Sequence, residues 1–434
     1  MSEDGQIRTV SQLGRWRGGA TPAKAVATYW GGDIPWVSPK DMSEGAIRDT
    51  LDRLTKAGAA RLELHSPGDI AVVFRSGILR RAFPVARGTI PFTVNQDLKV
   101  LHPAPNVDAG YAFHVLRGLE RHVVGSAVKS GTTVESVDTA VFYQTPVHVP
   151  QLADQRAIAE ILDTVDEAIG STEQFVAKLQ QMKQGLLHDL LTRGIDENGE
   201  LRDPELHPEE FRDSELGLIP ESWKVMAVGN LLAAVSPAMR SGPFGSALLK
   251  SELVGEGVPL LGIDNVHVER LESIYSRFVT PTKFRELSRY RVFPKDVMIT
   301  IMGTVGRCCV VPDDIGDALS SKHVWTLTFD QSRYSPLLAC LQFNYAPWAI
   351  GHFRRDEQGG IMSAIRSDTL RTALLPVPPR DEAAVIEQVC SISSRRVLDE
   401  ERLLEKLRLL RTGLQDDLLT GRVHATKLAG GNAA

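Results

Sequence analysis

One stretch of the sequence decides the fold: IAEILDTVDEAIGSTEQFVAKLQQMKQGLLHDL, residues 158–190. Apolar side chains recur in it at alternating steps of four and three, the heptad spacing of a helix that packs along a partner helix. Only Thr172 and Lys183 interrupt this apolar seam, which consists of Ile158, Leu162, Val165, Ile169, Val176, Leu179, Leu186 and Leu190. The pattern predicts one long helix with a partner.

The partner is predicted further along the same chain. A second seam occupies residues 386–418, and each of its positions lies 228 residues after its counterpart in the first seam. Between residues 178–192 and 406–420, 8 of 15 positions are identical, and Arg411 stands where the first copy has Lys183. This period is far longer than that of a solenoid repeat. The sequence therefore predicts a duplicated module, in which a globular domain is followed by a long helix.

Short motifs of the globular segments repeat in the same order. Residues 258–261 correspond to 34–37, residues 294–300 to the turn and strand that begin at Pro67, and residues 321–324 to 95–98. Glycine, proline and aspartate punctuate short apolar runs in both segments, which favours strands and turns. The predicted order is a domain at 1–149, a helix at 150–195, an acidic linker at 196–220, a domain at 221–377, a helix at 378–425 and a flexible tail at 426–434.

The composition is that of a folded protein with more than one domain. The chain has 434 residues, 43% hydrophobic and 24% charged, and contains no apolar run long enough for a membrane span. The opening Met1-Ser2-Glu3-Asp4 lacks a secretion signal, so the cytoplasm is the expected location. The four cysteines form no Cys-x-x-Cys pair and are expected to be buried thiols. No metal site and no phosphate-binding loop is predicted.

The net charge of −5 is unevenly distributed along the chain. Residues 1–145 carry +3 and residues 221–375 carry +2, whereas residues 146–220 carry −10. The two globular segments are therefore mildly basic, and a whole-chain pI says nothing about whether they bind nucleic acid.

Candidate DNA-binding residues cluster in both segments. Guanidinium groups can reach guanine edges or phosphates, and an amide can pair with adenine in a bidentate way. The alternatives are a solvated surface charge for each arginine and plain turn chemistry for the two amides. The candidates are Arg75, Arg80, Arg81, Asn95 and Gln96 in the first segment, and Arg307, Lys322, His323, Arg354 and Arg355 in the second.

The motifs resemble those of the specificity subunits of type I restriction-modification systems. Gly18 to Met42, Pro67 to Ile78 and Asn95 to Asp97 are similar to parts of that family's target recognition domains, as are the Gly242, Gly303 and Lys322 regions of the second half. Gln151 to Ala159 resembles the beginning of the family's first spacer helix. The second helix departs from the pattern, because Ala383 stands in place of Gln155.

The resemblance implies an α+β fold in which two target recognition domains are separated by two long antiparallel coiled-coil helices with pseudo-two-fold symmetry. Each domain would read one half of a split, asymmetric site in double-stranded DNA. Two methyltransferase subunits and the restriction subunits would be partners, and S-adenosylmethionine, ATP and magnesium would belong to those partners. The chain itself would have no catalytic residues and no cofactor.

Four residues of the helices are candidate partner contacts: Gln155, Arg156, Lys183 and Arg411. Lys183 and Arg411 interrupt the seam at equivalent positions, where a long cationic side chain can also extend to solvent. A seam of 33 residues spans about 50 Å at ~1.5 Å per residue, so the helices could set the distance between the two domains. The alternative is a helical hairpin without a spacing role.

Two other functions compete with DNA recognition by a non-catalytic subunit. A stand-alone nuclease or single-chain restriction-modification enzyme would need clustered carboxylates for metal-assisted hydrolysis or a methylase motif, and the sequence shows neither. A coiled-coil scaffold without a nucleic-acid role would not bind DNA in a gel-shift assay.

Overall fold

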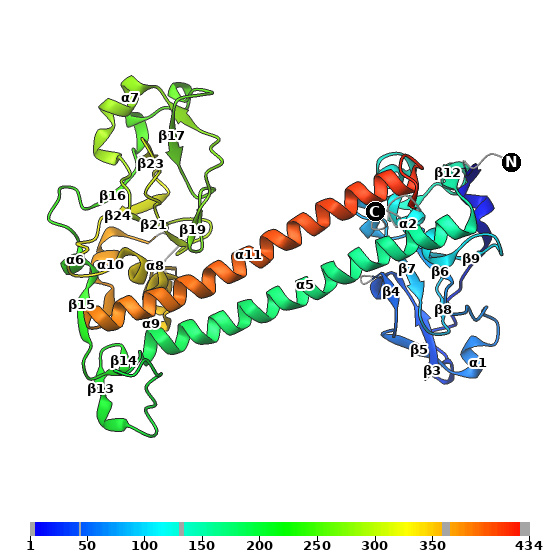
Figure 1. Cartoon of the computed structure of the whole chain (residues 1–434), viewed down its shortest axis with the longest axis horizontal. Helices are drawn as coiled ribbons and strands as arrows, with labels where there is room; N and C mark the ends of the chain where they lie inside the picture. Colours follow the sequence, from blue (N-terminus) through cyan, green and yellow to red (C-terminus); the bar gives the residue numbers. More distant parts are fainter. Residues whose placement is uncertain (1–4, 43–44, 130–133, 358–364, 426–434) are drawn as a thin grey trace, which may run out of the picture. The chain divides into compact units, whose positions relative to one another are not determined.

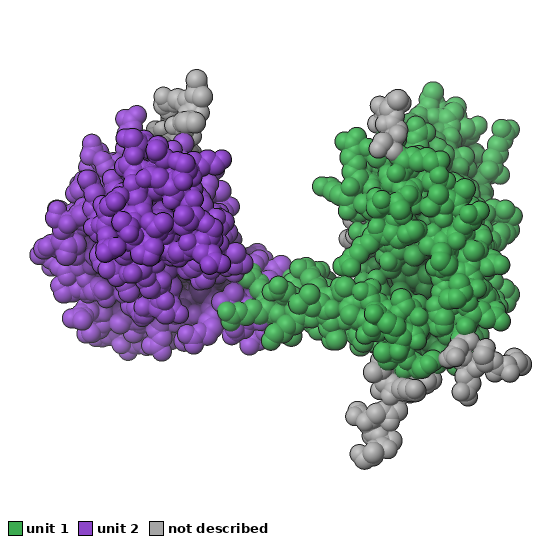
Figure 2. All heavy atoms as spheres, turned by 90° about the horizontal axis from the view of Figure 1, so that it is seen from above, with its two compact units in different colours: residues 1–174, 401–434 green, residues 175–400 purple. Residues whose placement is uncertain are grey.

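A computed structural model of the chain describes residues 5–42, 45–129, 134–357 and 365–425, without the side chains of residues 355–357. The flexible tail predicted at 426–434 lies outside the described residues. The chain forms two compact units, shown in different colours in Figure 2. Unit 1 comprises residues 1–174 and 401–434, and unit 2 comprises residues 175–400.

Two long helices contribute to both units: α5 (Leu152–Thr192, 41 residues) and α11 (Arg380–Leu419, 40 residues), shown in Figure 1. Within unit 1 they run antiparallel, since Arg411 Nε donates to Asp166 Oδ1 at 2.8 Å and Arg408 NH2 donates to Glu173 Oε1 at 2.6 Å. Both helices end in the same way, because a glycine with positive φ follows two residues after each last helical residue, Gly194 and Gly421. The predicted mixed α and β fold with two long helices is confirmed.

Unit 1 is built on a five-stranded sheet in the order β2-β9-β6-β7-β4 and a three-stranded sheet in the order β5-β3-β8. The pair β1-β12 leads directly into α5, and α2 packs on the larger sheet near β7. The elements are β1 (Gln6–Thr9), β2 (Gly14–Gly18), β3 (Trp30–Val37), β4 (Ala46–Ile47), β5 (Asp52–Leu54), α1 (Lys56–Ala59), β6 (Ile70–Val73), β7 (Val85–Gly88), β8 (Thr93–Val94), β9 (Leu98–Pro103), α2 (Ala109–Gly118), α3 (Glu120–His122), β10 (Val128–Lys129), β11 (Ser136–Val137), α4 (Thr139–Gln144) and β12 (Pro146–Val149).

Unit 2 contains a four-stranded sheet in the order β16-β24-β21-β22 and a three-stranded sheet in the order β20-β17-β23. The pair β15-β25 leads into α11, and the hairpin β13-β14 lies within the segment predicted as an acidic linker. The elements are β13 (Phe211–Ser214), β14 (Gly217–Pro220), β15 (Lys224–Ala227), α6 (Val228–Leu231), β16 (Met239–Ser241), β17 (Val258–Leu261), β18 (Val266–His267), β19 (Arg270–Leu271), β20 (Phe278–Val279), α7 (Pro281–Glu286), β21 (Val297–Thr300), β22 (Cys308–Val310), β23 (Leu319–Ser320), β24 (Val324–Leu327), α8 (Pro336–Tyr345), α9 (Pro347–Glu357), α10 (Ser367–Thr372) and β25 (Leu374–Val377).

The two units repeat one topology. The parallel pair β3-β8 of unit 1 corresponds to the parallel pair β17-β23 of unit 2, and the antiparallel series β2-β9-β6-β7 corresponds to β16-β24-β21-β22. The backbone bonds coincide as well, since Asn95 N donates to Val37 O at 2.9 Å and Ser321 N donates to Leu261 O at 2.8 Å. The motif correspondences seen in the sequence are therefore correspondences between strands.

Each unit has its own apolar core, and both long helices contribute to it. In unit 1, Ile158 and Leu162 of α5 and Leu418 of α11 are buried with the sheet residues. In unit 2 the same is true of Leu190 and Ile386. Burying a large apolar side chain stabilises the fold by about 1.5–3 kcal/mol. The ends of the seams are therefore held by the globular domains as well as by the partner helix.

The four cysteines are free and buried, as the sequence predicts. Among the described residues, no helix is long and apolar enough to cross a membrane.

Candidate nucleic-acid interface

Three of the candidates in unit 1 lie on two neighbouring turns. Arg75 follows β6, whereas Asn95 and Gln96 join β8 to β9. The amides of Phe74 and Arg75 both donate to Asp97 O, at 2.8 and 3.1 Å, so the two turns are bonded to each other. Arg75 and Gln96 are exposed. The structure thus brings together two polar side chains that are 21 positions apart in the sequence and leaves both accessible.

Asn95 has a different environment from Gln96. It is buried, its Nδ2 donates to Asp97 Oδ2 at 2.9 Å, and its Oδ1 accepts from Asp97 N at 3.0 Å. Its amide group is used by the turn, which agrees with the alternative of turn chemistry rather than adenine recognition. Gln96 accepts only the hydroxyl of Thr21, from the Gly18–Pro22 loop, among the described contacts.

The basic pair that follows Arg75 lies at the end of a short 3₁₀ turn, Gly77–Arg80. Arg80 donates to Glu135, and this ion pair lowers the pKa of Glu135. The side chain of Arg80 is nevertheless 73% exposed, and Arg81 is exposed beside it. Both arginines can therefore reach a ligand at the surface, although Arg80 would have to share its charge with Glu135.

Three candidates of unit 2 lie on the equivalent pair of turns. Arg307 closes the turn between β21 and β22, since its amide donates to Thr300 Oγ1 at 3.1 Å. Lys322 and His323 join β23 to β24, and Ile301 N donates to His323 O at 2.9 Å, which ties the two turns together. Lys322 is exposed, whereas Arg307 and His323 are half-buried. Burial and the nearby cations Lys322 and Arg277 lower the pKa of His323, so the ring is neutral at pH 7.

The remaining candidates lie on α9 and not on these turns. Arg354 is exposed, and the neighbouring Phe353 packs in the core against Phe343 at 5.5 Å between ring centroids. The side chain of Arg355 lies outside the described residues.

A glycine allows a third segment to approach the turns closely in each unit. A Cβ at Gly19 would lie 2.0 Å from Val94 O, and one at Gly242 would lie 2.0 Å from Ser320 O. No side chain fits at such a separation, so only glycine permits this approach. The close approach brings Thr21 to Gln96 in unit 1. Thr21 was not among the predicted residues, because it becomes adjacent to Gln96 only through this contact.

Arg277 is a second residue that the sequence patterns did not single out. It forms an ion pair with Asp264, and its charge acts on His323 of the β23–β24 turn. It lies outside every basic cluster of the sequence, so no local pattern could have identified it.

The four candidate partner contacts have different environments. Gln155 is fully buried: its Oε1 accepts from Asp108 N at 2.8 Å, and its Nε2 donates to Pro150 O at 2.8 Å and Asn106 O at 3.1 Å. It therefore ties the beginning of α5 to the loop before α2. A contact of this residue with another subunit stays a prediction, but the described fold already uses the whole amide group.

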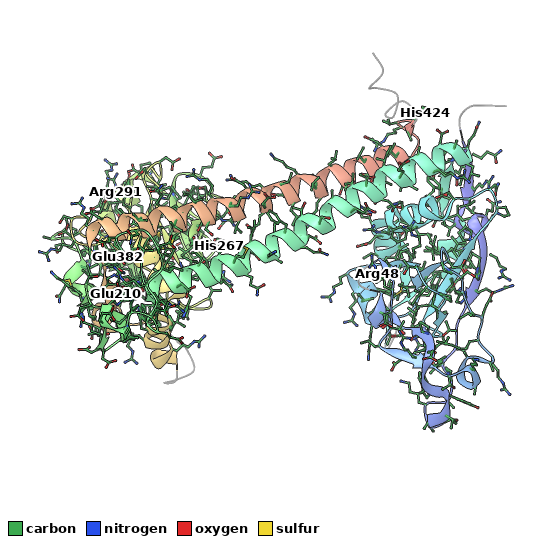
Figure 3. All side chains as sticks on the ribbon, turned by 60° about the horizontal axis from the view of Figure 1, so that its bottom comes forward. Arg48, Glu210, His267, Arg291, Glu382 and His424 are labelled. Atoms are coloured by element: carbon green, nitrogen blue, oxygen red, sulfur yellow. The ribbon has the colours of Figure 1, made fainter. Side chains whose placement is uncertain are left out.

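The second helix begins with another arrangement, which explains how it tolerates Ala383. Glu382 accepts both terminal nitrogens of Arg202, at 2.5 and 3.2 Å, and also Ile195 N at 3.0 Å. Arg202 also lies 3.7 Å from Glu210, and Figure 3 shows Glu382 and Glu210 in this region of unit 2. The segment that follows α5 thus holds the beginning of α11, in place of the glutamine that holds α5.

The two cations of the seam are both paired within their own unit. Arg411 donates to Asp166, as does Arg117 of α2 at 2.5 Å. Lys183 donates to Glu269 Oε1 at 2.5 Å. Both cations are mostly buried, with exposed fractions of 16% and 13%. Neither extends freely to solvent, so the structure favours an internal pairing role for them.

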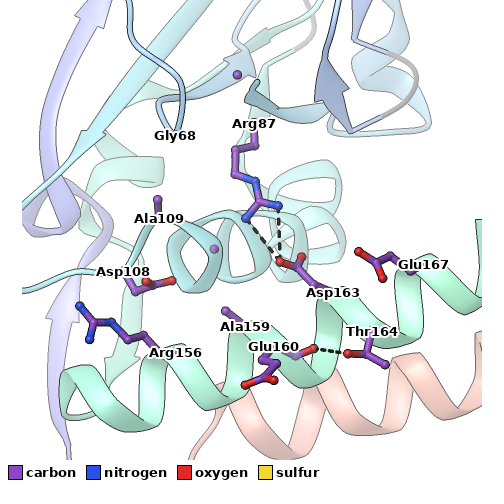
Figure 4. A pocket seen from close by; sticks show the side chains of 12 residues that line it. Gly68, Arg87, Asp108, Ala109, Arg156, Ala159, Glu160, Asp163, Thr164 and Glu167 are labelled. Carbon is purple, nitrogen blue, oxygen red and sulfur yellow. Dashed lines mark hydrogen bonds and ion pairs between the residues drawn. The ribbon is translucent and has the colours of Figure 1, made fainter. Parts of the chain in front are cut away.

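Arg156 is exposed at the rim of a cavity of about 580 Å³ in unit 1. Figure 4 shows this cavity between the first turns of α5 and the Gly68 and Arg87 segments, with Arg87 directed at Asp163. Its ionisable lining residues are Asp108, Glu160, Asp163, Glu167, Arg87 and Arg156. Four carboxylates against two guanidinium groups make the cavity acidic, which suits a basic side chain of a partner.

Comparisons with known proteins find similarity to the DNA specificity proteins of type I restriction systems. Residues 2–181 match the model of the family described as type I restriction modification DNA specificity domain. The chain is 31% identical over 187 residues to the Escherichia coli type I restriction enzyme EcoR124I/EcoR124II specificity subunit, which covers 42% of this chain and 46% of that protein. It is also 22% identical over 435 residues to the Methanocaldococcus jannaschii type I restriction enzyme MjaVIII specificity subunit. That match covers 98% of this chain and 94% of that protein.

The fold is similar to that of solved specificity subunits. The type I restriction-modification S subunit of M. genitalium matches with a TM-score of 0.59 and 13% identity over 96% of each chain. A chain from a structural study of type I system assembly matches with a TM-score of 0.54 and 15% identity, over 98% of this chain and 99% of that one. The chain therefore resembles type I restriction-modification specificity subunits over its length, and its residues 2–181 match the DNA specificity domain of that family. None of these relatives supports the alternative of a nuclease.

Proposed function

We propose that the chain is the subunit that reads DNA sequence for a type I restriction-modification complex, and that each unit reads one half of a split site in double-stranded DNA. One observation carries this proposal: six of the ten candidate DNA-binding side chains, three in each unit, lie on equivalent pairs of turns, after β6 and β8 in unit 1 and after β21 and β23 in unit 2. The scaffold is repeated while the exposed side chains differ. The two units would thus share one fold and recognise different half-sites.

The side chains suit direct readout of bases. Gln96 offers a donor and an acceptor that match the edge of adenine, and Arg75 offers a bidentate donor pair for guanine. Lys322 offers a point charge for a phosphate or a guanine, and Arg307 on the neighbouring turn offers a guanidinium group. The mild positive charge of both globular segments supplies the attraction to the DNA backbone that does not depend on sequence.

Catalysis is assigned to partner subunits. Two methyltransferase subunits, one on each side, would modify adenine with S-adenosylmethionine, and restriction subunits would cleave DNA with ATP and magnesium. The acidic cavity beside Arg156 is a candidate contact for one methyltransferase subunit, since its carboxylates complement a basic surface. The expected location is the cytoplasm, where such a complex meets DNA.

The test is to produce the chain with its methyltransferase subunit in a host that lacks other adenine methylation, and to sequence the methylated positions. The proposal expects a bipartite motif with a fixed spacer. Arg75→Ala or Gln96→Ala should relax or change one half of the motif, and Lys322→Ala or Arg307→Ala the other half.

Arg121→Ala is a matched control, because this exposed arginine of unit 1 lies on α3 and on neither of the two turns. It should leave the motif unchanged. A continuous motif, or a motif that none of the four substitutions in the turns alters, would contradict the proposal.

A further inference from the structure

Three side chains that can bind a metal converge in unit 1, away from the candidate DNA-binding turns. Glu63 and His65 lie in the segment between α1 and β6, and His102 lies near the end of β9. One ligand atom of each residue lies within 4.8 Å of the others. A carboxylate and two imidazoles form the ligand set of many zinc sites.

Two of the distances between these ligand atoms agree with tetrahedral coordination. His65 Nδ1 lies 3.3 Å from His102 Nε2, and Glu63 Oε1 lies 3.4 Å from His102 Nε2. Ligand atoms at ~2.0–2.1 Å from a tetrahedral zinc ion are about 3.3–3.4 Å apart. The same ring separation is long for a hydrogen bond between two imidazoles. Two of the three distances between the ligand atoms thus already match those of a site that contains zinc.

A further carboxylate orients one of the rings. Asp69 Oδ1 lies 2.9 Å from His102 Nδ1, so it accepts the proton of that nitrogen and leaves the lone pair of Nε2 directed at the other two residues. A carboxylate behind a coordinating histidine is the usual arrangement in metal sites, where it sets the tautomer and the ring orientation. Asp69 is itself held, because its Oδ2 accepts from Ser66 N at 2.7 Å.

The second unit shows that the fold does not require these three ligands. Asp296 corresponds to Asp69, since its Oδ2 accepts from Phe293 N at 2.7 Å in the equivalent turn. His65 N donates to Phe92 O at 2.8 Å, and its counterpart Val292 N donates to Ala318 O at 3.0 Å.

All three ligand positions differ in unit 2. They are occupied there by Tyr290, the fully buried Val292 and Thr328, and Asp296 binds Arg240 and Thr328 instead. Unit 1 therefore has three ligands and an orienting carboxylate where unit 2 has none of the ligands.

The charges around the cluster are compatible with a dication. Two carboxylates, those of Glu63 and Asp69, lie at His102 and supply negative charge for a dication. Glu63 also accepts Arg15 NH2 at 2.8 Å, and Arg17 Nε lies 3.4 Å from its other oxygen. A carboxylate has about four acceptor positions, so Glu63 can bind both an arginine and a metal ion.

We propose that Glu63, His65 and His102 bind one zinc-like divalent cation, with Asp69 as the positioning residue and water in the remaining coordination position. Imidazole and carboxylate ligands in a small tetrahedral set favour zinc over calcium or magnesium. The cation would tie the segment before β6 to the end of β9. In the register of these strands Ile70 faces Leu101 and Val73 faces Leu98, so the cluster lies at the opposite end of the strands from Arg75 and Gln96. The site is therefore structural rather than part of DNA reading.

The test is metal analysis of the untagged full chain. The protein is stripped with a chelator, dialysed against zinc chloride and then against buffer, and its zinc content is measured. One zinc ion per chain is expected. His65→Val and His102→Thr, which copy the residues of unit 2 and should therefore fold, are expected to lose the bound zinc. Circular dichroism verifies that each variant is folded.

Two further variants separate positioning from a structural effect. Asp69→Asn should weaken zinc affinity by about 10–100-fold while the absorption spectrum of the cobalt-substituted protein stays that of a tetrahedral site. His207→Gln is the control, because this exposed histidine also lies beside a carboxylate, Glu209, at 3.2 Å. It should retain the zinc ion. A folded wild-type chain without zinc, or unchanged zinc content in both His65→Val and His102→Thr, would overturn the proposal and leave a hydrogen bond between the two rings.

Discussion

At the scale of single residues, neighbouring side chains of one motif have different roles. Asn95 and Gln96 are adjacent in the sequence and chemically alike, but the buried Asn95 bonds to Asp97, whereas the exposed Gln96 contacts only Thr21 among the described residues. The sequence left adenine recognition and turn chemistry open for both. Burial decides between them, because a side chain whose amide is used within the fold cannot also read a base.

Asn95→Ala should therefore destabilise the protein, whereas Gln96→Ala should not. The first substitution removes two hydrogen bonds of a buried turn, each worth about 0.5–1.5 kcal/mol. Chemical denaturation of both variants measures the free energy of unfolding, and a DNA-binding assay with the assembled complex measures affinity. Gln96→Ala is expected to lower the affinity for DNA while the free energy of unfolding stays unchanged. Equal stability loss in the two variants would contradict this division of roles.

At the scale of elements, the mostly buried cations at equivalent positions of the two long helices are paired with carboxylates from different elements. The seam cation Arg411 pairs with Asp166 of the facing helix. The position equivalent to Asp166 in the second helix is Ser394, which has no charge. Glu269, from the loop between β18 and β19, supplies the missing carboxylate, since it accepts Lys183 Nζ at 2.5 Å and Ser394 Oγ at 2.6 Å. The hydroxyl of Tyr345 also donates to it.

Glu269→Ala is expected to destabilise unit 2 by about 3–5 kcal/mol, because it leaves the largely buried ammonium group of Lys183 unpaired. The double variant Lys183→Met with Glu269→Gln should recover most of this loss, since no charge then remains in the site. Thermal unfolding of the two variants tests this. Glu286→Ala removes an exposed pairing with Lys283 and is the control, with an expected change of less than about 1 kcal/mol. If the single variant melts like the control, Glu269 is not essential to the seam.

The helices also contain glycines that the packing does not require. A Cβ at Gly185 of α5 or at Gly413 of α11 would meet no atom within 4 Å. Replacing either by alanine should therefore stabilise the protein by about 0.5–1 kcal/mol through the higher helix propensity of alanine. Gly242→Ala is the contrasting variant and should destabilise it strongly, because its Cβ would collide with Ser320 O. Melting temperatures compare the three. A loss of stability in Gly185→Ala would show that this glycine has a packing role that the free chain does not reveal.

At the scale of the whole molecule, the repeat separates two functions. Each unit has its own core and its own pair of candidate turns, and both long helices contribute to both cores. The proposed half-site readers can therefore vary independently, whereas a change in the helices affects both units.

Exchange of residues 1–149 for the corresponding domain of another specificity subunit should change one half of the methylated motif and leave the other half intact. The reason is that the core of unit 2 contains no residue from that range. Sequencing of methylated positions in a host that produces the chimaera with its methyltransferase subunit gives the result. The converse exchange of residues 221–377 is the matched experiment. If either exchange altered both halves, the two readers would not be independent.

The sequence by itself determined the duplicated architecture, the two long helices and the order of strands that recur in both halves. Such features follow from local periodicity and from an ungapped repeat, which can be read without knowing any distant contact. The candidate turns could be named for the same reason, because turn residues mark them in both copies. A metal site was not predicted, since Glu63 and His65 lie 37 or more positions before His102 and form no recognised spacing. Only the tertiary structure decided that these ligands converge, that Asn95 is buried beside an exposed Gln96, and that Glu269 neutralises Lys183, because each depends on which segments the sheets and helices bring into contact.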